Sequence, residues 1–451
     1  MTKRTILAGT RPVARARQRV KAVDHSEVLE VLLLLRDRGA SPPDATFALG
    51  GSSVHDRKHL DPVELQALSG ASETDLEEVR QFAADHELQV IRVDPGARTI
   101  VVRGSVGNVN RAFSTELHHY RAADQDFRSH ENEISVPKEL GEIVTGVFGL
   151  DDRSVARRPR FAAGSGPAPP PVDENTKRPS AFTDLYAFPD DATGKGQCIA
   201  ILEFQGGFEK TKLESYLQRL GVKAPKIIVR EIGRGRNDPR NEPNTINPDV
   251  EVYMDLEIVA STAPDATIVV YFGENNEMGW VETLRAAVFD ATHRPAVMSI
   301  SWGWAEEYWK ADTIKAIDDA FQKAAALGIT VCCSSGDLGV FEANDPPEPF
   351  TVAFPASSPY VLACGGTRLE TLPGGSTKES VWNQSSTIGM TSGGGVSRVY
   401  DLPPFQSGSD IPERFGTAQS GRGIPDVAAN ASSLTGYMVW ADDTAMSMGG
   451  T

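Results

Sequence analysis

Two acidic side chains, Glu251 and Asp255, have a spacing that could support acid–base chemistry. They are four residues apart in an apolar segment, and in a helix that spacing puts both on one face. Burial and mutual repulsion would raise the pKa of one carboxyl and give a base that works in acid, where histidine would be protonated. The alternative is a solvated acidic face that also includes Asp249 and Glu257.

A third carboxyl, Asp337, ends the apolar run that begins at Val331 and passes through Ser335-Gly336. A protonated carboxyl in this place can hydrogen-bond a developing oxyanion, which an ionised carboxylate cannot do. An aspartate after glycine at the end of a strand is also a common turn former. The residues alone leave both interpretations open.

A glycine run occupies Ser392, Gly393, Gly394 and Gly395. A phosphate-binding loop would need a following Lys-Ser/Thr and a strand–loop–helix context, and this segment has neither. We therefore expect these residues to expose backbone to an extended peptide.

The elements that must position these side chains follow an α/β pattern from about residue 180 onward. Short apolar strands alternating with amphipathic helices predict a parallel sheet covered on both faces. Active residues gather at the carboxyl ends of such strands, where Trp302 and Asp337 stand. The predicted strands are 197–204, 267–272, 296–302 and 329–334, and the predicted helices are 210–220, 250–261, 278–291 and 311–327.

Residues from about 20 to 150 form a different unit, in which helices alternate with strands and cover one face of an antiparallel sheet. Ser72-x-x-Asp75 resembles a helix cap, and Asp94-Pro95-Gly96 is a hairpin-type connection. The predicted helices are 26–38, one following Ser72, and 106–113, and the predicted strands are 88–93 and 99–103.

Between the units, basic residues at 157–160 precede a Gly/Ser/Pro-rich segment at 164–171. This composition indicates an exposed, extended linker, which serves either as a plain tether or as a protease-sensitive junction. We predict a first domain at 1–160, a linker at 161–180 and a second domain at 181–451.

Net charge and composition limit the classes of partner that the chain can bind. A net charge of −16 argues against nucleic acid or an anionic membrane surface as the main partner, and 40% hydrophobic with 24% charged residues is ordinary for a globular protein. The four cysteines form no disulfide framework and no metal-ligand spacing. The N-terminus has no apolar core of signal-peptide length, and Leu32–Leu35 is too short to span a membrane.

Taken together and in order, these motifs resemble the sedolisins, the serine-carboxyl peptidases, and in particular those with a kumamolisin-type pro-region. The chain ends in a Gly-Gly-Thr run that in subtilisin-like proteases precedes the nucleophile motif Ser-Ala-x-Ala-Pro. The matching segments are 71–72, 144–150, 251–257, 299–303, 335–337, 354–361, 365–367, 392–397 and 423–428.

The resemblance implies a subtilisin-like α/β catalytic domain behind a ferredoxin-like α+β prodomain, with cleavage in the linker on maturation. It implies Glu251 as general base, Asp255 as its supporting carboxyl and Asp337 as oxyanion stabiliser. Glu203 and Trp302 match positions that extend the carboxyl network. It further implies an acid-acting, secreted, monomeric endopeptidase zymogen that takes polypeptide substrates and is inhibited by its own prodomain.

Two expected features are absent from the 451 residues. The nucleophilic serine is expected directly after Thr451, and the family's calcium site is built further toward the C-terminus. We interpret the chain as a truncated peptidase that is inactive alone; the alternative is a natural remnant that binds peptides or inhibits. Use of Ser447 or Thr451 as a substitute nucleophile is disfavoured, because no helix follows to fix Thr451. Some relatives carry an acidic residue near the specificity pocket where this chain has Ala353, so the resemblance does not support a preference for a basic substrate residue there.

Overall fold

The computed structural model describes residues 3–13, 17–39, 56–122, 125–156, 177–189, 191–240, 248–340, 350–374, 376–387, 389–441 and 444–451. The chain divides into two compact units. The first comprises residues 1–155, 275–292 and 307–328, and the second comprises 156–274, 293–306 and 329–451. Residues 161–176 of the predicted linker lie outside the described part of the chain.

The first unit contains a β–α–β–β–α–β arrangement. Its antiparallel sheet has the order β4-β5-β3-β9, and helices α3 and α4 connect its strands along the chain, which is the ferredoxin-like topology expected for this region. The bounds are β3 Val28–Leu35, α3 Glu73–Asp85, β4 Gln89–Asp94, β5 Thr99–Ser105, α4 Val106–Phe113 and β9 Val144–Phe148.

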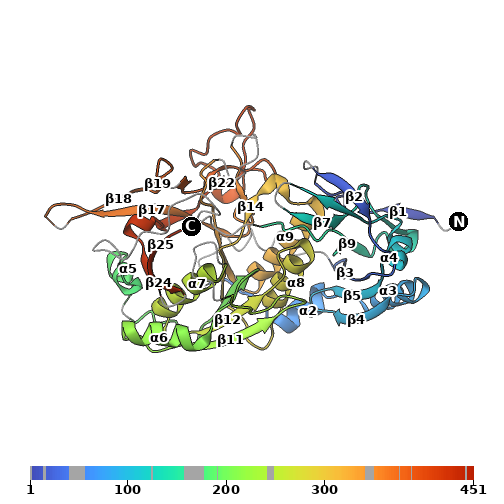
Figure 1. Cartoon of the computed structure of the whole chain (residues 1–451), viewed down its shortest axis with the longest axis horizontal. Coiled ribbons are helices and arrows are strands. Elements are labelled where there is room, and N and C mark those ends of the chain that lie inside the picture. Colours follow the sequence, from blue (N-terminus) through green and yellow to red (C-terminus); the bar gives the residue numbers. More distant parts are fainter. Residues whose placement is uncertain are drawn as a thin grey trace. The chain divides into compact units, whose positions relative to one another are not determined.

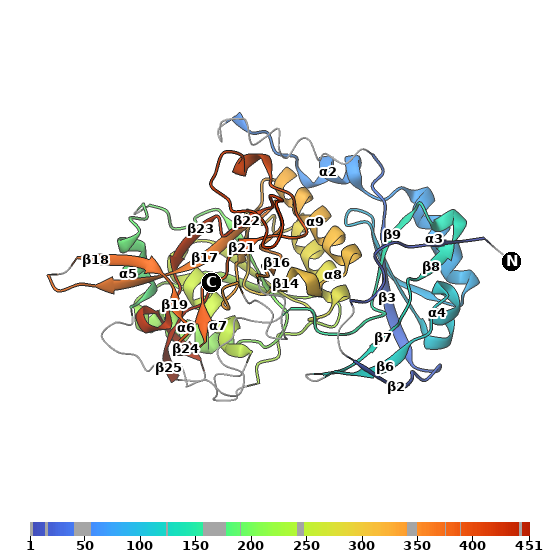
Figure 2. The same cartoon turned by 90° about the horizontal axis from the view of Figure 1, so that it is seen from above.

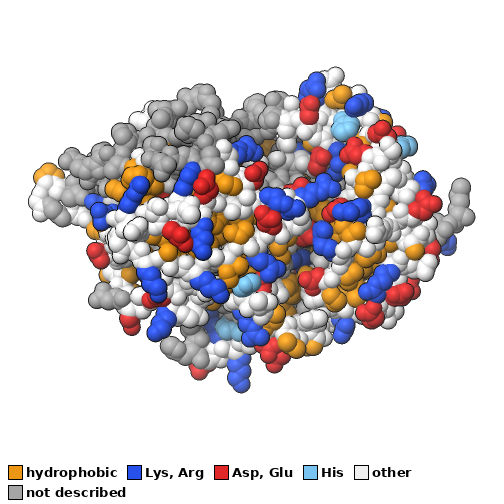
Figure 3. Space-filling model, turned by 60° about the horizontal axis from the view of Figure 1, so that its bottom comes forward, with side chains coloured by type: hydrophobic (Ala, Val, Ile, Leu, Met, Phe, Trp, Pro, Cys, Tyr) orange, Lys and Arg blue, Asp and Glu red, His pale blue; other side chains and the backbone are white. Residues whose placement is uncertain are grey.

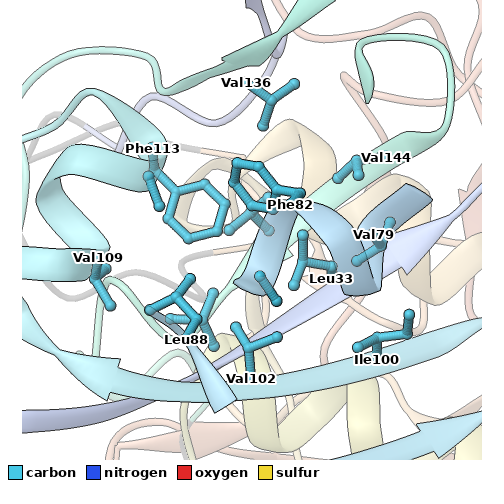
Figure 4. Packing of buried hydrophobic residues seen from close by; sticks show 14 of the residues in the cluster. Leu33, Val79, Phe82, Leu88, Ile100, Val102, Val109, Phe113, Val136 and Val144 are labelled. Atoms are coloured by element: carbon cyan, nitrogen blue, oxygen red, sulfur yellow. The ribbon is translucent and has the colours of Figure 1, made fainter. Parts of the chain in front are cut away.

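Local sequence signals explain where these helices begin. The hydroxyl of Ser72 accepts a hydrogen bond from the backbone N–H of Asp75 at 3.0 Å, so the predicted cap is confirmed. Ser105 caps α4 in the same way through the N–H of Asn108. The inner faces of both helices then meet the sheet in one buried core, which Figure 4 shows around Phe82 and Phe113.

The helix predicted over 26–38 is wrong, because residues 28–35 form the strand β3. This strand pairs with β5 on one side and with β9 on the other, and is therefore central. Val31 to Leu35 are all buried, so both faces of the strand are apolar. A continuous apolar run of this length does not show the two-residue period of a half-exposed strand, and periodicity alone cannot separate it from a buried helix.

Two helices that lie far along the chain also belong to the first unit. They are α8 (Glu277–Val288) and α9 (Ala311–Ala326), which lie side by side. Both appear next to each other in Figures 1 and 2. The unit's other elements are β1 Arg4–Ile6, β2 Gln18–Ala22, α2 Pro62–Ser69, β6 His118–Arg121, β7 Asp126–Ser129, β8 Ser135–Pro137 and the 3-10 helix Lys138–Leu140.

The second unit is built on a mostly parallel sheet with the order β11-β12-β10-β13-β15-β17, confirming the α/β prediction. Its antiparallel edge strand β18 pairs with β17, and the two form the long orange ribbon in Figure 2. The bounds are β10 Cys198–Glu203, β11 Lys226–Glu231, β12 Thr267–Phe272, β13 Val297–Ile300, β15 Thr330–Ser334, β17 Leu362–Thr371, β18 Thr377–Val381 and β23 Val427–Asn430, the last paired with β17.

One apolar core of this unit joins the sheet to α6 (Lys210–Leu220) and α7 (Asp249–Thr262). The hairpin of β24 (Tyr437–Ala441) and β25 (Thr444–Met448) contributes Val439 and Met448 to the same core. The smaller elements are α5 Pro179–Leu185, β14 Trp304–Ala305, β16 Ala353–Phe354, β19 Asn383–Gln384, β20 Met390–Thr391, β21 Gly395–Val396, β22 Gly423–Ile424 and the 3-10 turns at 306–308, 404–406 and 433–435.

Acidic and basic side chains are interspersed on the face drawn in Figure 3, with small apolar patches between them. Within the described ranges, none of the helices combines the length and the apolar character needed to cross a bilayer.

Candidate functional site

The candidate residues of the second unit stand where several elements begin or end. Glu203 is the last residue of β10, Trp302 follows β13, and Asp337 follows β15. These strands run parallel, so their carboxyl ends meet at one edge of the sheet. Glu251 and Asp255 both lie on α7.

A buried carboxyl network joins β10, α7 and the segment after β13. The indole N–H of Trp302 donates to Oε2 of Glu203 at 2.9 Å, and the carboxyls of Glu203 and Asp255 hydrogen-bond each other. The hydroxyl of Ser301 lies 2.9 Å from both carboxylate oxygens of Asp255. Ser301 lies in the segment 299–303 that matches the family, but its contact with Asp255, 46 residues away, could not be predicted from spacing.

Burial sets the charge of this network. It raises the pKa of Glu203 well above the usual range, and the neighbouring Asp255 carboxylate raises it further. Burial also raises the pKa of Asp255 to about 6, against the hydrogen bonds from Ser301 and Glu203 that favour its ionised form. Each of the two carboxyls therefore keeps its proton to a higher pH than an exposed carboxyl does.

Glu251 is 2% exposed in the first turn of α7. Asp249 is buried as well: its carboxylate accepts the N–H groups of Gly207 at 2.9 Å and Arg240 at 2.6 Å. Glu257 is also buried, with the N–H of Trp440 donating to it at 2.8 Å. The solvated acidic face considered as an alternative for this helix is therefore wrong.

Asp337 is a buried carboxyl held against the last residue of the chain. The N–H of Thr451 donates to Oδ1 of Asp337 at 3.0 Å, and the hydroxyl of Thr451 accepts the N–H of Gly336 at 3.0 Å. Burial raises the pKa of Asp337 to about 6, and the Thr451 hydrogen bonds oppose that rise. Among the described residues the second oxygen, Oδ2, has no hydrogen-bond partner. The carboxyl can thus carry a proton on Oδ2 in mildly acidic solution.

The glycine run packs directly on the turn that carries Asp337. The N–H of Gly393 donates to the carbonyl of Gly336 at 2.6 Å, and the hydroxyl of Ser335 donates to the carbonyl of Gly393 at 2.8 Å. A Cβ on Gly393 would lie 2.0 Å from the carbonyl oxygen of Ser335, so no other residue fits there without a shift. The hydroxyl of Ser392 accepts the N–H of Gly366, and Gly395 pairs with Ile424. The backbone of Gly393 is therefore engaged within the protein.

No group of three or more His, Cys, Asp or Glu side chains that could hold a metal ion occurs among the described residues. None of the four cysteines, all of which are described, forms a disulfide.

A second cluster of buried charges lies in the first unit. Arg98 from the loop before β5 pairs with Asp319 of α9 and lies 2.7 Å from Asp37. Arg285 of α8 also pairs with Asp319, and Lys323 lies 3.0 Å from Asp37. The nearby cations of Arg285, Arg98 and Lys323 hold the pKa of Asp319 well below its usual range. These pairs link α8 and α9 to the N-terminal sheet.

Comparison with known proteins finds two families and several relatives. Residues 16–153 match the pro-kumamolisin activation domain, and residues 239–451 match the subtilase family. The chain is similar to kumamolisin from Bacillus sp. (strain MN-32), with 40% identity over 466 aligned positions that cover all of this chain and 82% of that protein.

Sedolisin from Pseudomonas sp. (strain 101) is 29% identical over 381 positions, which cover 80% of this chain and 62% of that protein. A solved structure of Pseudomonas sedolisin, a serine-carboxyl proteinase complexed with two molecules of pseudo-iodotyrostatin, matches with a TM-score of 0.53 and 27% identity. It covers 63% of this chain and 77% of that structure.

Proposed function

Because this chain belongs to the sedolisin family of serine peptidases and carries a pro-kumamolisin activation domain, we propose that it is part of the zymogen, the inactive precursor, of an acid-acting endopeptidase. In this proposal Glu251, Asp255 and Asp337 form the catalytic machinery, together with a serine that follows Thr451 in a longer parent protein. The observation that carries the proposal is the contact of Thr451 with Asp337, which would bring the next residue to the oxyanion carboxyl.

In the acylation step Glu251 takes the serine proton as the serine oxygen attacks the scissile carbonyl carbon, and the carbonyl oxygen becomes an oxyanion. The protonated carboxyl of Asp337 donates a hydrogen bond to that oxyanion. Glu251 then gives its proton to the leaving amine, and water hydrolyses the acyl-enzyme by the same route. Asp255 supports Glu251 from the same helix, α7. Glu203 hydrogen-bonds Asp255 and is itself held by the indole N–H of Trp302.

The raised pKa values support work in acid. Asp337 must be protonated to donate, and its pKa of about 6 keeps the proton in place below that pH. With an ordinary pKa of about 4, Asp337 would be ionised between about pH 4 and 6 and would repel an oxyanion.

The activation domain is proposed to act as an intramolecular inhibitor that is cut in the linker on maturation. Protonation of Asp319 in strong acid would weaken its pairs with Arg98 and Arg285. Secretion, calcium in the complete protein and a monomeric state stay predictions.

The test uses the parent protein, defined by the gene downstream of codon 451. A reading frame that continues with Ser-Ala-x-Ala-Pro and a product that cleaves peptides between about pH 3 and 6 support the proposal. Glu251→Gln, Asp255→Asn and Asp337→Asn should each abolish most activity, whereas Glu214→Gln, in a side chain that is 48% exposed, should not. A natural stop after Thr451, or full activity of Glu251→Gln, would contradict the proposal; the stop would favour the peptide-binding remnant.

A further inference from the structure

Glu306 is a buried carboxylate that the proposed reaction does not use. It directly follows β14, is 1% exposed, and its own N–H donates to the carbonyl of Val352 at 3.0 Å. The acceptor oxygens of its side chain point at the backbone that follows the glycine run. Because water does not solvate this carboxylate, hydrogen-bond donors of the protein must stabilise it.

The carboxylate binds three donors from one short segment. The hydroxyl of Ser397 donates to Oε2 at 2.7 Å, and the N–H groups of Arg398 and Val399 both donate to Oε1, the latter at 3.3 Å. The hydroxyl oxygen of Ser397 also accepts the N–H groups of Val399 and Tyr400, at 3.1 and 2.9 Å. Both lone pairs of Ser397 are thus in use, so its proton must point to Glu306.

The other end of the same segment is fixed to the turn that carries Asp337. The N–H of Thr391 donates to the carbonyl of Asp337 at 2.8 Å, and Gly393 exchanges hydrogen bonds with Ser335 and Gly336. Residues 391–399 therefore run from Asp337 to Glu306 with an anchor at each end.

We propose that Glu306 is a positioning residue for the oxyanion carboxyl, which it holds in place through residues 391–399. This inference rests on the proposed function, since it assigns Glu306 a part in placing Asp337. The segment also pairs with β22, and the N–H of Ser397 donates to the carbonyl of Arg422 at 2.8 Å. Loss of the Glu306 anchor removes the bonds that add to this pairing, which loosens the packing of Gly393 on Ser335 and Gly336 and lets Asp337 move from the position that its donor role requires. A displacement of about 1 Å at such a group costs on the order of 10²-fold in rate.

Glu306→Gln is the sharpest single change because it keeps the size of the side chain. The carboxylate accepts the hydroxyl of Ser397 on one oxygen and the N–H of Arg398 on the other. The amide of glutamine has only one oxygen, and its NH₂ group cannot accept, so one of these two hydrogen bonds is lost. Ser397→Ala removes the same contact from the opposite side. Asp401→Asn is the matched control, since it neutralises a nearby carboxylate whose side chain is 99% exposed.

The first measurement is amide hydrogen exchange on the present chain. We expect Glu306→Gln and Ser397→Ala to speed exchange of the Gly336, Gly393 and Arg398 amides, and Asp401→Asn to leave them unchanged. Unchanged exchange at Gly336 and Gly393 in both variants would overturn the inference. This result stands whether or not the parent protein proves to be a peptidase.

The second measurement separates positioning from general stability, in the parent protein. Glu306→Gln should lower kcat by about 10- to 10²-fold with little change in KM. In an Asp337→Asn background the same change should have almost no further effect on kcat, because the group it positions is gone. If the two factors simply multiply, Glu306 does not act through Asp337.

Discussion

Replacement of Asp337 by asparagine tests the protonation state on which the site depends. The folded-state pKa of Asp337 is raised to about 6 by burial, from 3.8. The folded chain therefore keeps this proton at pH values where the unfolded chain has lost it, and stability falls as pH rises from about 4 to about 6. A difference of about two pKa units corresponds to about 3 kcal/mol.

Asparagine has the same shape and cannot ionise, so it removes this pH dependence. Its NH₂ group takes the place of Oδ2, which has no hydrogen-bond partner among the described residues, and its oxygen can still accept from Thr451. We expect wild type and Asp337→Asn to be about equally stable near pH 4. Near pH 7 the variant should be more stable, by up to about 3 kcal/mol.

The assay is urea unfolding of the present chain at both pH values, followed by a probe confined to the second unit, such as amide exchange in β13 and β15. Asp255 also titrates near pH 6, but it is common to both proteins and cancels in the comparison. An identical stability difference at pH 4 and pH 7 would refute the reasoning, since it would mean that Asp337 ionises normally in the folded chain.

Three further predictions concern other parts of the chain. In the parent protein Glu251→Gln should lower kcat by about 10²- to 10⁴-fold at every pH, and a pH-rate profile with an unchanged plateau would exclude it as the base. Gly393→Ala should destabilise the second unit, measured by thermal unfolding, because its Cβ would lie 2.0 Å from the carbonyl oxygen of Ser335; a fully stable variant would show that the turn can shift. Asp319→Asn should weaken the first unit at neutral pH and reduce its loss of stability in acid. The reason is that Arg285, Arg98 and Lys323 hold the pKa of the Asp319 carboxyl low in the folded chain, and the stability that this gives is lost as pH falls below about 4. A pH–stability curve parallel to that of wild type would contradict it.

The sequence predicted the strands β10, β12, β13 and β15 and the helices α6 and α7 of the second unit, because strands and helices there differ clearly in length and period, but it did not predict β11 or β17. The helix 210–220 and the strand 267–272 agree with the structure to the residue. In the first unit the helix predicted over 26–38 is wrong, because the pairing of β3 on both edges is a long-range property that a local apolar run does not reveal.

The candidate site, too, could be predicted from the sequence only in part. The spacing of Glu251 and Asp255 showed that they share a helix, but burial of that helix depends on residues distant in sequence. The contact between Asp337 and Thr451 joins positions 114 residues apart, and the role of Ser301 depends on how β13 ends beside α7. Such contacts follow from tertiary packing, which spacing does not encode.

Because α8 and α9 belong to the same unit as the N-terminal sheet, the proposed cut in the linker and the release of the N-terminal fragment are separate events. A cut between residues 161 and 180 breaks one covalent connection but none of the ion pairs of Arg98 and Asp37 with α9. The two fragments should therefore stay together as a nicked, non-covalent complex that co-elutes on a sizing column at neutral pH. The rate at which active peptidase appears would then be set by dissociation of the fragments rather than by the cut.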